Sequence, residues 1–487
     1  MSFSKNEKIE LDIIDMTKDG LGVAKVDSQV FFVKNAILED RVNAVITKVT
    51  TNVIYAKALD IVNKSKYRVE SKCDVSNSCG GCQLLNLDYK KQIELKKNVV
   101  LNTISKIGKI SFEDLNERYE GIIAMETPHR FRNKMQVPFA IRDGKVVYGF
   151  YAGRTHHIVE FDYCLSGFKG SDVILNIIRD AITKYNISVY DENTNDGVFR
   201  EVLIRCGNVS NEISLTYIIN DKNYDNNLEL YKAFDNYIVE EISKSQDIEC
   251  RGRHSVVPCR GEVLRALTTS TLNINTSNTN VLFGNKNIIL RGLGYIEDSI
   301  GNVKYHISPE SFYQVNMKMT KILYDKVLEY ADFTGNENVL DLYCGIGTIS
   351  LYMAGKVKSV LGVEIVESAV ENAKSNAALN NIKNAKFICL DASKITKDII
   401  SSNASGVNID TVVVDPPRKG LDKATIDLIR DIDPKKIIYV SCDPATLSRD
   451  IDILCNIEKK YIVQRFANVD MFPHTMHIET VMSLVHV

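Results

Sequence analysis

Hydrophobic and polar residues alternate along the first sixty residues of the chain. Apolar positions recur with a period of two in short runs separated by Gly and Asp turns, at 8–14, 22–26, 30–33, 42–48 and 53–60. This spacing predicts half-buried β-strands. Five such strands in about fifty residues are typical of a small closed barrel of the oligonucleotide-binding kind. We therefore expect a β-barrel over residues 1–62, which either binds RNA or serves packing alone.

The remainder of the chain predicts two further domains. Residues 84–107 have helical spacing, and strands and helices mix from about 122 to 282, which predicts an α+β domain over 63–295. Strand-like runs then alternate with helical segments, at 338–342, 359–363, 385–389, 411–414 and 436–440. That alternation indicates a doubly wound α/β domain with a parallel sheet over 296–487. The fold class is therefore multidomain.

Composition limits the possible functions. A chain of 487 residues is too long for one core. It has no run of about eighteen uncharged apolar residues and its N-terminus lacks the apolar centre of a secretory signal, so we expect a cytoplasmic protein without a membrane span. Eleven cysteines in such a chain favour metal or catalytic use over disulfides. A net charge of −2 means that any RNA surface must be a local patch.

A glycine turn joins an apolar strand to a helix in the segment Asp341-Leu-Tyr-Cys-Gly-Ile-Gly-Thr348. Such glycines let the backbone approach a nucleotide cofactor closely. Glu364 follows about twenty residues later, where a carboxylate can accept hydrogen bonds from ribose hydroxyls. Thr348 occupies the place of the third glycine of a dinucleotide site, which favours S-adenosylmethionine over NAD. The alternative is a plain strand-to-helix turn.

A second block supplies a cysteine nucleophile. Cys442 follows the predicted strand 436–440 and precedes a predicted helix, at the sheet edge where open α/β folds bind ligands. A helix N-terminus lowers the pKa of a thiol. Asp415 begins the nearby Asp-Pro-Pro-Arg motif. Cys344 in the glycine turn is the rival nucleophile, and an ordinary buried cysteine is the alternative for Cys442.

Glu479 lies in a strand-like run, 476–484, with apolar residues on both sides. Partial desolvation raises the pKa of a carboxylate toward the range of a general base. The alternative is a salt bridge at the rim of the site.

Four cysteines suggest a metal centre. Cys73, Cys79 and Cys82 are spaced by five and two intervening residues around two glycines, and Cys164 lies far downstream. Four thiolates suit a 4Fe–4S cluster or zinc, and a fourth ligand favours a closed, structural site. Cys250 and Cys259 crowd with arginines within 245–270, where a basic loop is a better interpretation than a zinc site.

Together these blocks resemble the RNA uracil-5-methyltransferases, specifically the iron–sulfur branch that acts on 23S ribosomal RNA and carries a TRAM barrel. The resemblance covers nearly the whole chain. Its motifs, besides the cysteine cluster, are Phe131–Gln136, Gly149–Tyr151, Ile158–Cys164, Ser308–Asn316, Asp341–Thr348, Asp415–Gly420, Ser441–Asp443 and Pro473–Glu479. Thr348 departs from the asparagine that relatives often carry.

The resemblance implies roles for individual residues. Cys442 is the nucleophile and Glu479 the base, and Phe312, Asp415 and Arg132 contact the RNA. The pocket for S-adenosylmethionine comprises Gln314, Tyr343, Thr348, Glu364, Asp391 and Asp415. The 4Fe–4S ligands are Cys73, Cys79, Cys82 and Cys164. The expected partner is RNA, with 23S ribosomal RNA favoured, and the expected state is a monomer.

Rival functions remain open. A tRNA uracil-5-methyltransferase shares these motifs. An RNA cytosine-5-methyltransferase carries a cysteine in this part of the Asp-Pro-Pro motif, and an amino-methyltransferase carries an aromatic residue after it. This chain has Arg418 there, which disfavours both. A non-catalytic iron–sulfur protein of ribosome assembly is the candidate from a different class.

Overall fold

The computed structural model of the protein describes residues 3–153, 155–245, 267–279, 281–403 and 408–487. Contacts divide the chain into two compact units. The first unit comprises Met1–Pro128, Pro416–Asp422 and Lys436–Val487, and the second His129–Asp415 and Lys423–Lys435. Most of the predicted basic loop at 245–270, including both of its cysteines, lies outside the described residues. The boundaries of the three domains set from the sequence remain predictions.

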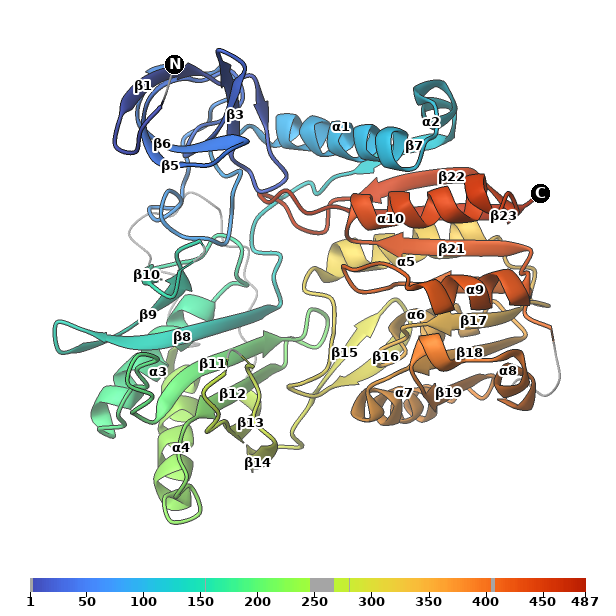
Figure 1. The fold of residues 1–487 in the computed structure, drawn as a ribbon. Coiled ribbons are helices and arrows are strands. Elements are labelled where there is room, and N and C mark those ends of the chain that lie inside the picture. The colour runs from blue at the N-terminus through green and yellow to red at the C-terminus, as the bar shows by residue number, and fades with distance from the viewer. Residues whose placement is uncertain (1–2, 154, 246–266, 280, 404–407) are drawn as a thin grey trace. The chain divides into compact units, whose positions relative to one another are not determined.

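The first unit begins with the predicted barrel (Figure 1). Its strands pair in the order β1-β5-β6-β4-β3-β2, and alternate residues such as Phe31, Val33 and Val42 fill the interior. The five predicted strands are confirmed, and a two-residue strand joins them. Their bounds are β1 Lys8–Asp12, β2 Asp15–Met16, β3 Gly22–Val26, β4 Gln29–Lys34, β5 Arg41–Val49 and β6 Val53–Asn63.

A long helix follows the cysteine segment. Helix α1 spans Tyr89–Ile107 and therefore starts five residues later than the apolar spacing predicted. Asp88 ends the preceding loop, because its carboxylate accepts the backbone N–H of Lys91 at 3.2 Å as an N-cap. Leu84 and Leu87 pack instead in a cluster with Met16 of the barrel and Met476. Helix α2, Phe112–Arg118, and strand β7, Tyr119–Ile123, come next.

The C-terminal part of the first unit is a sheet in the order β21-β23-β22-β7. Strand β23 is antiparallel to both β21 and β22. Helix α10, Pro444–Ile451, follows β21 and continues into the π-helical turn Asp452–Ile457. The strands are β21 Lys436–Ser441, β22 Tyr461–Val469 and β23 Glu479–His486.

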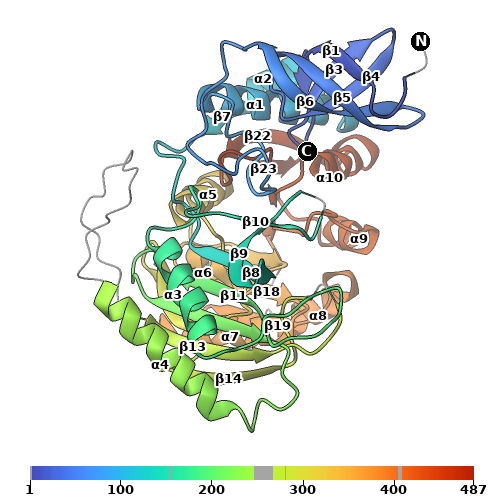
Figure 2. The same cartoon turned by 90° about the vertical axis from the view of Figure 1, so that its left-hand side faces the viewer.

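The second unit contains a seven-stranded sheet in the order β10-β9-β8-β11-β12-β13-β14. Helices α3, Ser171–Lys184, and α4, Leu228–Ser245, pack side by side against it (Figure 2). This sheet confirms the mixture of strands and helices predicted for the middle of the chain. Its strands are β8 Lys134–Arg142, β9 Lys145–Tyr151, β10 Ile158–Glu160, β11 Phe199–Cys206, β12 Ile213–Ile219, β13 Leu267–Ile274 and β14 Lys286–Arg291.

The second unit also contains four parallel strands in the order β19-β18-β17-β20, as the sequence predicted. A hairpin of β15, Ile296–Ile300, and β16, Val303–Ile307, precedes them. The remaining elements are α5 Met317–Ala331, β17 Asn338–Leu342, α6 Thr348–Ala354, β18 Ser359–Glu364, α7 Glu367–Leu379, β19 Ala385–Cys389, a 3₁₀ turn Ala392–Lys394, α8 Lys397–Asn403, β20 Thr411–Val414 and α9 Lys423–Ile432.

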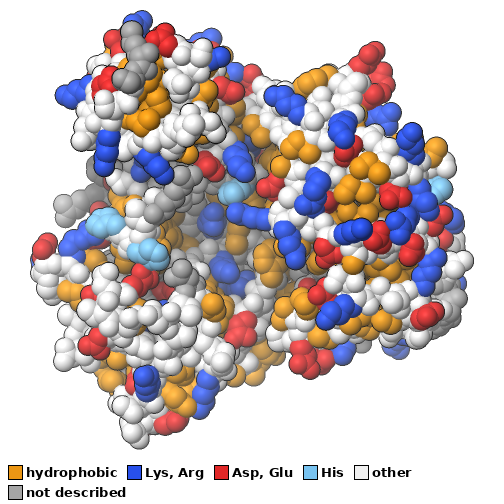
Figure 3. Space-filling view, viewed as in Figure 1, with side chains coloured by type: hydrophobic (Ala, Val, Ile, Leu, Met, Phe, Trp, Pro, Cys, Tyr) orange, Lys and Arg blue, Asp and Glu red, His pale blue; other side chains and the backbone are white. Residues whose placement is uncertain are grey.

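Two surface properties bear on the choice of partner. Within the described ranges, none of the helices has both the length and the apolar character needed to cross a bilayer. On the face shown in Figure 3, Lys and Arg side chains are interspersed with Asp and Glu side chains. That mixture agrees with the net charge of −2 and confines any attraction for RNA to local groups.

Candidate active site

The predicted cofactor turn leaves β17 through a run of left-handed backbone. Tyr343, Gly345 and Gly347 have φ values of 67°, 55° and 80°. Gly347 is the N-cap of α6, and a Cβ there would lie 3.0 Å from the Phe387 ring. The turn therefore needs glycine at this position for both conformation and space. A positive φ is strained for a non-glycine residue such as Tyr343, and strained residues of this kind are concentrated at binding and active sites.

Glu364 shapes the same turn from the end of β18. One carboxylate oxygen accepts the N–H of Gly345 at 3.1 Å and the other accepts the N–H of Val366 at 2.9 Å. A carboxylate has about four lone-pair sites, so these two bonds leave acceptors for ribose hydroxyls. Asp391 caps the 3₁₀ turn after β19, where one oxygen accepts from the backbone and hydroxyl of Ser393.

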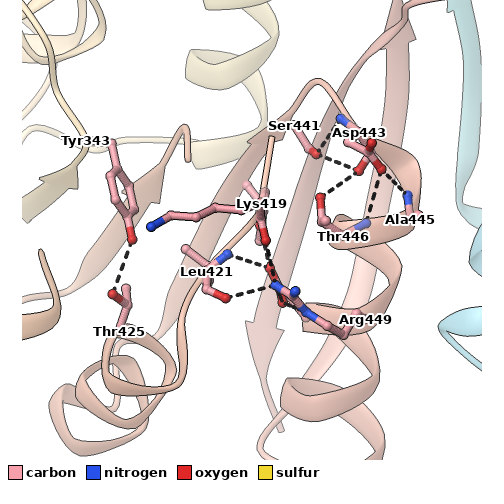
Figure 4. Close-up of polar contacts among 11 residues, drawn as sticks. Tyr343, Lys419, Leu421, Thr425, Ser441, Asp443, Ala445, Thr446 and Arg449 are labelled. Atoms are coloured by element: carbon pink, nitrogen blue, oxygen red, sulfur yellow. Dashed lines mark hydrogen bonds and ion pairs between the residues drawn. The ribbon is translucent and has the colours of Figure 1, made fainter. Parts of the chain in front are cut away.

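Thr348 is fixed by two tyrosines that the sequence analysis did not identify. The Tyr324 hydroxyl donates to Thr348 Oγ1 at 2.8 Å, and the Tyr305 hydroxyl donates to the Thr348 carbonyl at 3.0 Å. The Tyr343 hydroxyl lies 3.2 Å from Thr425 Oγ1 of α9 (Figure 4). No local pattern in the sequence indicates these long-range contacts.

Two carboxyl groups stand near the carboxyl ends of adjacent parallel strands, Asp341 buried and Asp415 partly buried. Asp341 is in β17, and Asp415 follows Val414, which pairs with Leu342 in β20. Burial raises the pKa of each to about 7. Ser350 donates to Asp341 Oδ2, while Asp341 Oδ1 is buried without a partner. The sequence analysis assigned no role to Asp341, although its place in the turn motif was a signal.

Three further predicted residues lie around the segment between β16 and α5. Phe312 is 70% exposed, which is unusual for an aromatic ring and suits stacking on a base. Gln314 is buried, and its backbone carbonyl accepts a hydrogen bond from the side-chain amide of Asn133 at 3.1 Å. Arg132 precedes Asn133, so the Phe131–Gln136 motif and the Ser308–Asn316 motif meet through this contact.

The predicted nucleophile lies in the first unit, between β21 and α10. Asp443 follows Cys442 and caps α10, accepting the N–H groups of Ala445 and Thr446 at 2.8 and 3.3 Å (Figure 4). Arg449 of the same helix donates to the Leu421 carbonyl at 2.8 Å and so fixes the loop after Asp-Pro-Pro. Cys442 is partly exposed.

The ladder between β21 and β23 ends one residue away from both the predicted nucleophile and the predicted base. Ser441 pairs with Thr480 and Val440 with Val481. Continuing this antiparallel register by one residue puts Cys442 opposite Glu479, which is 5% exposed. The rival Cys344 is buried, and burial raises the pKa of its thiol, which makes it a poor nucleophile.

Helix α1 holds the loop that leads to Glu479. Gln92 accepts the His474 backbone N–H at 3.1 Å, and its amide lies 3.2 Å from His474 Nδ1. The Lys96 ammonium contacts Asp470 at 2.5 Å and donates to the Phe472 carbonyl at 3.0 Å. These contacts position the loop from outside strands β21 and β23.

The predicted metal centre is not supported by the geometry. Cys73, Cys79 and Cys82 are partly buried, and the Gly81 N–H donates to Cys79 Sγ at 3.4 Å. Across the ranges that the structure describes, His, Cys, Asp and Glu side chains form no group of three or more that could hold a metal ion. Cys164 belongs to the second unit.

Known proteins that are similar to this chain are RNA methyltransferases and proteins with a TRAM domain. The family model described as tRNA (Uracil-5-)-methyltransferase matches residues 285–487, and the TRAM domain model matches 4–59. An uncharacterized RNA methyltransferase of Bacillus cereus is 42% identical over 484 residues, covering 99% of this chain and 97% of the relative. One of Clostridium tetani is 38% identical over 482 residues, covering 99% and 97%.

A solved structure shows the same fold. It is the tRNA (uracil-54, C5)-methyltransferase of Pyrococcus abyssi with S-adenosyl-L-homocysteine, at a TM-score of 0.73 and 24% identity, covering 98% of this chain and 99% of that one. The chain belongs to the RNA uracil-5-methyltransferase family with an N-terminal TRAM domain. The family and fold support an RNA methyltransferase that uses S-adenosylmethionine.

Proposed function

We propose that this protein methylates C5 of uracil in RNA through a covalent bond between Cys442 and C6 of the base. The observation that supports the proposal is the β21–β23 register, because its last pair, Ser441 with Thr480, directly precedes Cys442 in one strand and directly follows Glu479 in the other. A thiol that only filled space would need no carboxylate beside it, whereas addition to a pyrimidine and its reversal need both a nucleophile and a base.

The two side chains divide the reaction between them. The Cys442 thiolate adds to C6, which leaves an enolate with electron density at C5. S-adenosylmethionine, when bound, supplies the methyl group that C5 takes up. Glu479 then accepts the C5 proton, and the electrons of that C–H bond restore the C5–C6 double bond and expel the thiolate. The base must leave its stack, because both ring faces are used.

The cofactor pocket is proposed for the second unit. Gln314, Tyr343, Thr348, Glu364, Asp391 and Asp415 are the residues that we assign to S-adenosylmethionine. The space beside Gly345 is open, because a Cβ there would meet no atom within 4 Å, and the free lone pairs of Glu364 suit ribose hydroxyls. Phe312, Asp415 and Arg132 are assigned to the RNA, with Phe312 available for stacking.

We propose 23S ribosomal RNA as the substrate, on the basis of the Cys73–Cys82 spacing. The tRNA alternative has its own support, since the Pyrococcus abyssi relative acts on uracil 54 of tRNA. Mapping 5-methyluridine in ribosomal and transfer RNA from cells with and without the gene decides between them. We further propose a cytoplasmic monomer with the domain boundaries 1–62, 63–295 and 296–487.

A transfer assay tests the proposed reaction itself. Purified protein, S-adenosylmethionine and RNA from the deletion strain should yield 5-methyluridine, measured by mass spectrometry of the nucleosides. Cys442→Ala should yield none while still binding the cofactor. Cys455→Ala is the matched control, because burial raises the pKa of that thiol to about 12 and leaves it inert. Equal product from both variants would refute the nucleophile.

The 4Fe–4S proposal rests on donor chemistry alone. Four thiols at this spacing are suitable iron ligands, and the Gly81 N–H bond to Cys79 Sγ is of a kind that tunes iron–sulfur sites. Iron and sulfide analysis of anaerobically purified protein tests it, and zinc without iron would overturn it. No step of the proposed reaction uses the cluster.

A further inference from the structure

Arg205 is a buried cation whose hydrogen-bonding capacity is mostly unused. It lies on β11, is 2% exposed, and donates through Nη2 to the Ser311 carbonyl at 2.9 Å. Its Nε and Nη1 atoms are buried with no partner. No Asp or Glu of the described second unit forms an ion pair with it. Burial lowers the pKa of Arg205 to about 10, so the side chain is still charged at neutral pH.

A second cation faces Arg205 across the sheet. Lys134 of β8 is its direct partner in the antiparallel register, and directly opposed side chains lie on the same face. Burial, followed by the charges of Arg205 and Arg132, lowers the pKa of Lys134 to about 8. Among the ion pairs of the described residues, none joins Lys134 or Arg132 to a carboxylate. Three cations are therefore gathered without an anion.

Such a cluster is unfavourable unless something compensates it. Burying a charge without a partner is expensive, and like charges close together add to that cost. Arg205 is buried, whereas Lys134 and Arg132 are partly exposed, and a negatively charged ligand at the site would offset the cost of the Arg205 charge. The Arg205 guanidinium, with unused N–H donors, has the geometry that binds phosphate oxygens.

The surroundings indicate which anion this is. Arg205 holds the carbonyl of Ser311, the residue directly before the exposed ring of Phe312. Cationic side chains next to an exposed aromatic ring are the combination that binds single-stranded nucleic acid, in which the charges contact the backbone and the ring stacks on a base. The aromatic ring would not be needed for a free carboxylate.

We infer that Arg205, Lys134 and Arg132 form a binding site for a phosphodiester of the RNA strand next to the target nucleotide. This inference rests on the proposed function, because it takes RNA as the substrate. Arg205 anchors the phosphate from inside the sheet and at the same time fixes the backbone that presents Phe312. The site thereby couples the position of the RNA backbone to the position of the stacking ring.

The test measures RNA binding directly, without methyl transfer. Fluorescence anisotropy with a labelled single-stranded RNA should show about 10-fold weaker binding for Lys134→Met and for Arg205→Met, the worth of one charge-assisted hydrogen bond. The slope of log affinity against log salt should fall by about 1 for each variant. Lys145→Met is the matched control, an exposed cation at the end of β9 in the same sheet, and it should bind as the wild type does.

The outcomes separate this site from its rivals. If Lys134→Met leaves the RNA affinity and the salt slope unchanged, the phosphate site is refuted. If Arg205→Met does not fold, the result for Lys134→Met alone decides whether the site exists. If calorimetry instead shows weaker binding of S-adenosylmethionine with unchanged RNA affinity, the anion is the cofactor's carboxylate and the assignment is wrong. If the variants bind RNA more weakly but the wild-type protein makes no 5-methyluridine, the phosphate site is supported and the proposed reaction is refuted.

Discussion

Removing the ammonium group of Lys96 should destabilise the first unit severely. Lys96 and Asp470 have fully buried side chains, and their charged atoms are 2.5 Å apart. Burial lowers the pKa of Lys96, which the Asp470 charge opposes. In Lys96→Met, Asp470 would keep its hydrogen bond from the Tyr89 hydroxyl, at 2.8 Å, but would lose its countercharge.

The expected magnitude follows from the burial of both partners. Leaving one member of a buried ion pair uncompensated costs about 3–5 kcal/mol. For a cooperative unit of about 150–250 residues, each kcal/mol lowers the melting temperature by about 2–4 °C, so the variant should melt about 6–20 °C below the wild type. Removing both charges, in Lys96→Met/Asp470→Asn, should recover much of this loss, because no unpaired charge is left in the interior.

Thermal unfolding followed by circular dichroism provides the assay. Lys90→Met is the matched control, since Lys90 lies on the same helix but is exposed, and its loss should change stability by less than about 0.5 kcal/mol. If Lys96→Met melts with the control, or the double variant is no more stable than the single one, the buried pair does not stabilise the loop before Glu479 and the reasoning fails.

Four other predictions test separate parts of the account. Glu479→Gln should accumulate a covalent complex with RNA, seen as a shifted band in denaturing gels, because addition and methylation proceed while elimination stops; normal turnover would argue for a structural carboxylate. The pKa values of Asp341 and Asp415 are raised to about 7, so between about pH 3.9 and 7 the folded state holds protons that the unfolded chain releases. The protonated carboxyl groups therefore stabilise the folded state fully below about pH 3.9, and this stabilisation is lost as the pH rises through about 7. The melting temperature should therefore decline between pH 5 and 8, less so in Asp415→Asn, and an identical decline would contradict the assignment. Deleting residues 1–62 should weaken RNA binding strongly and leave affinity for S-adenosylmethionine unchanged, measured by anisotropy and calorimetry; equal RNA affinity would reduce the barrel to packing. Anaerobic protein should contain about four irons per chain if the cluster forms, and iron-free protein that retains its cysteines unmodified would exclude it.

The elements that the sequence predicted well are those with a clear local period. The barrel strands alternate between buried and more exposed positions over much of their length, and the parallel strands β17 to β20 are short, mainly apolar runs between glycine-rich or polar turns. The start of α1 was predicted wrongly because Leu84 and Leu87 match a helical stripe but pack against Met16 and Met476. The N-cap at Asp88 was the signal that would have corrected it.

The parts of the site that could not be predicted depend on contacts between distant residues. Lys96 and Asp470 meet across most of the chain, and nothing near either residue indicates the pair. Arg205 lies in an ordinary strand, and only its burial without a carboxylate makes it a candidate for binding RNA. The cysteine spacing predicted a metal centre, but spacing alone does not determine whether the sulfur atoms converge.

The most direct test of the central claim is to trap the covalent intermediate. RNA that contains 5-fluorouracil can undergo addition and methylation, but the fluorine at C5 cannot be removed as a proton, so the enzyme should remain attached to the RNA. With S-adenosylmethionine present, we expect a stable complex whose cross-linked peptide contains Cys442, identified by mass spectrometry. Absence of a complex, or attachment through another cysteine while 5-methyluridine is formed on normal RNA, would contradict the account.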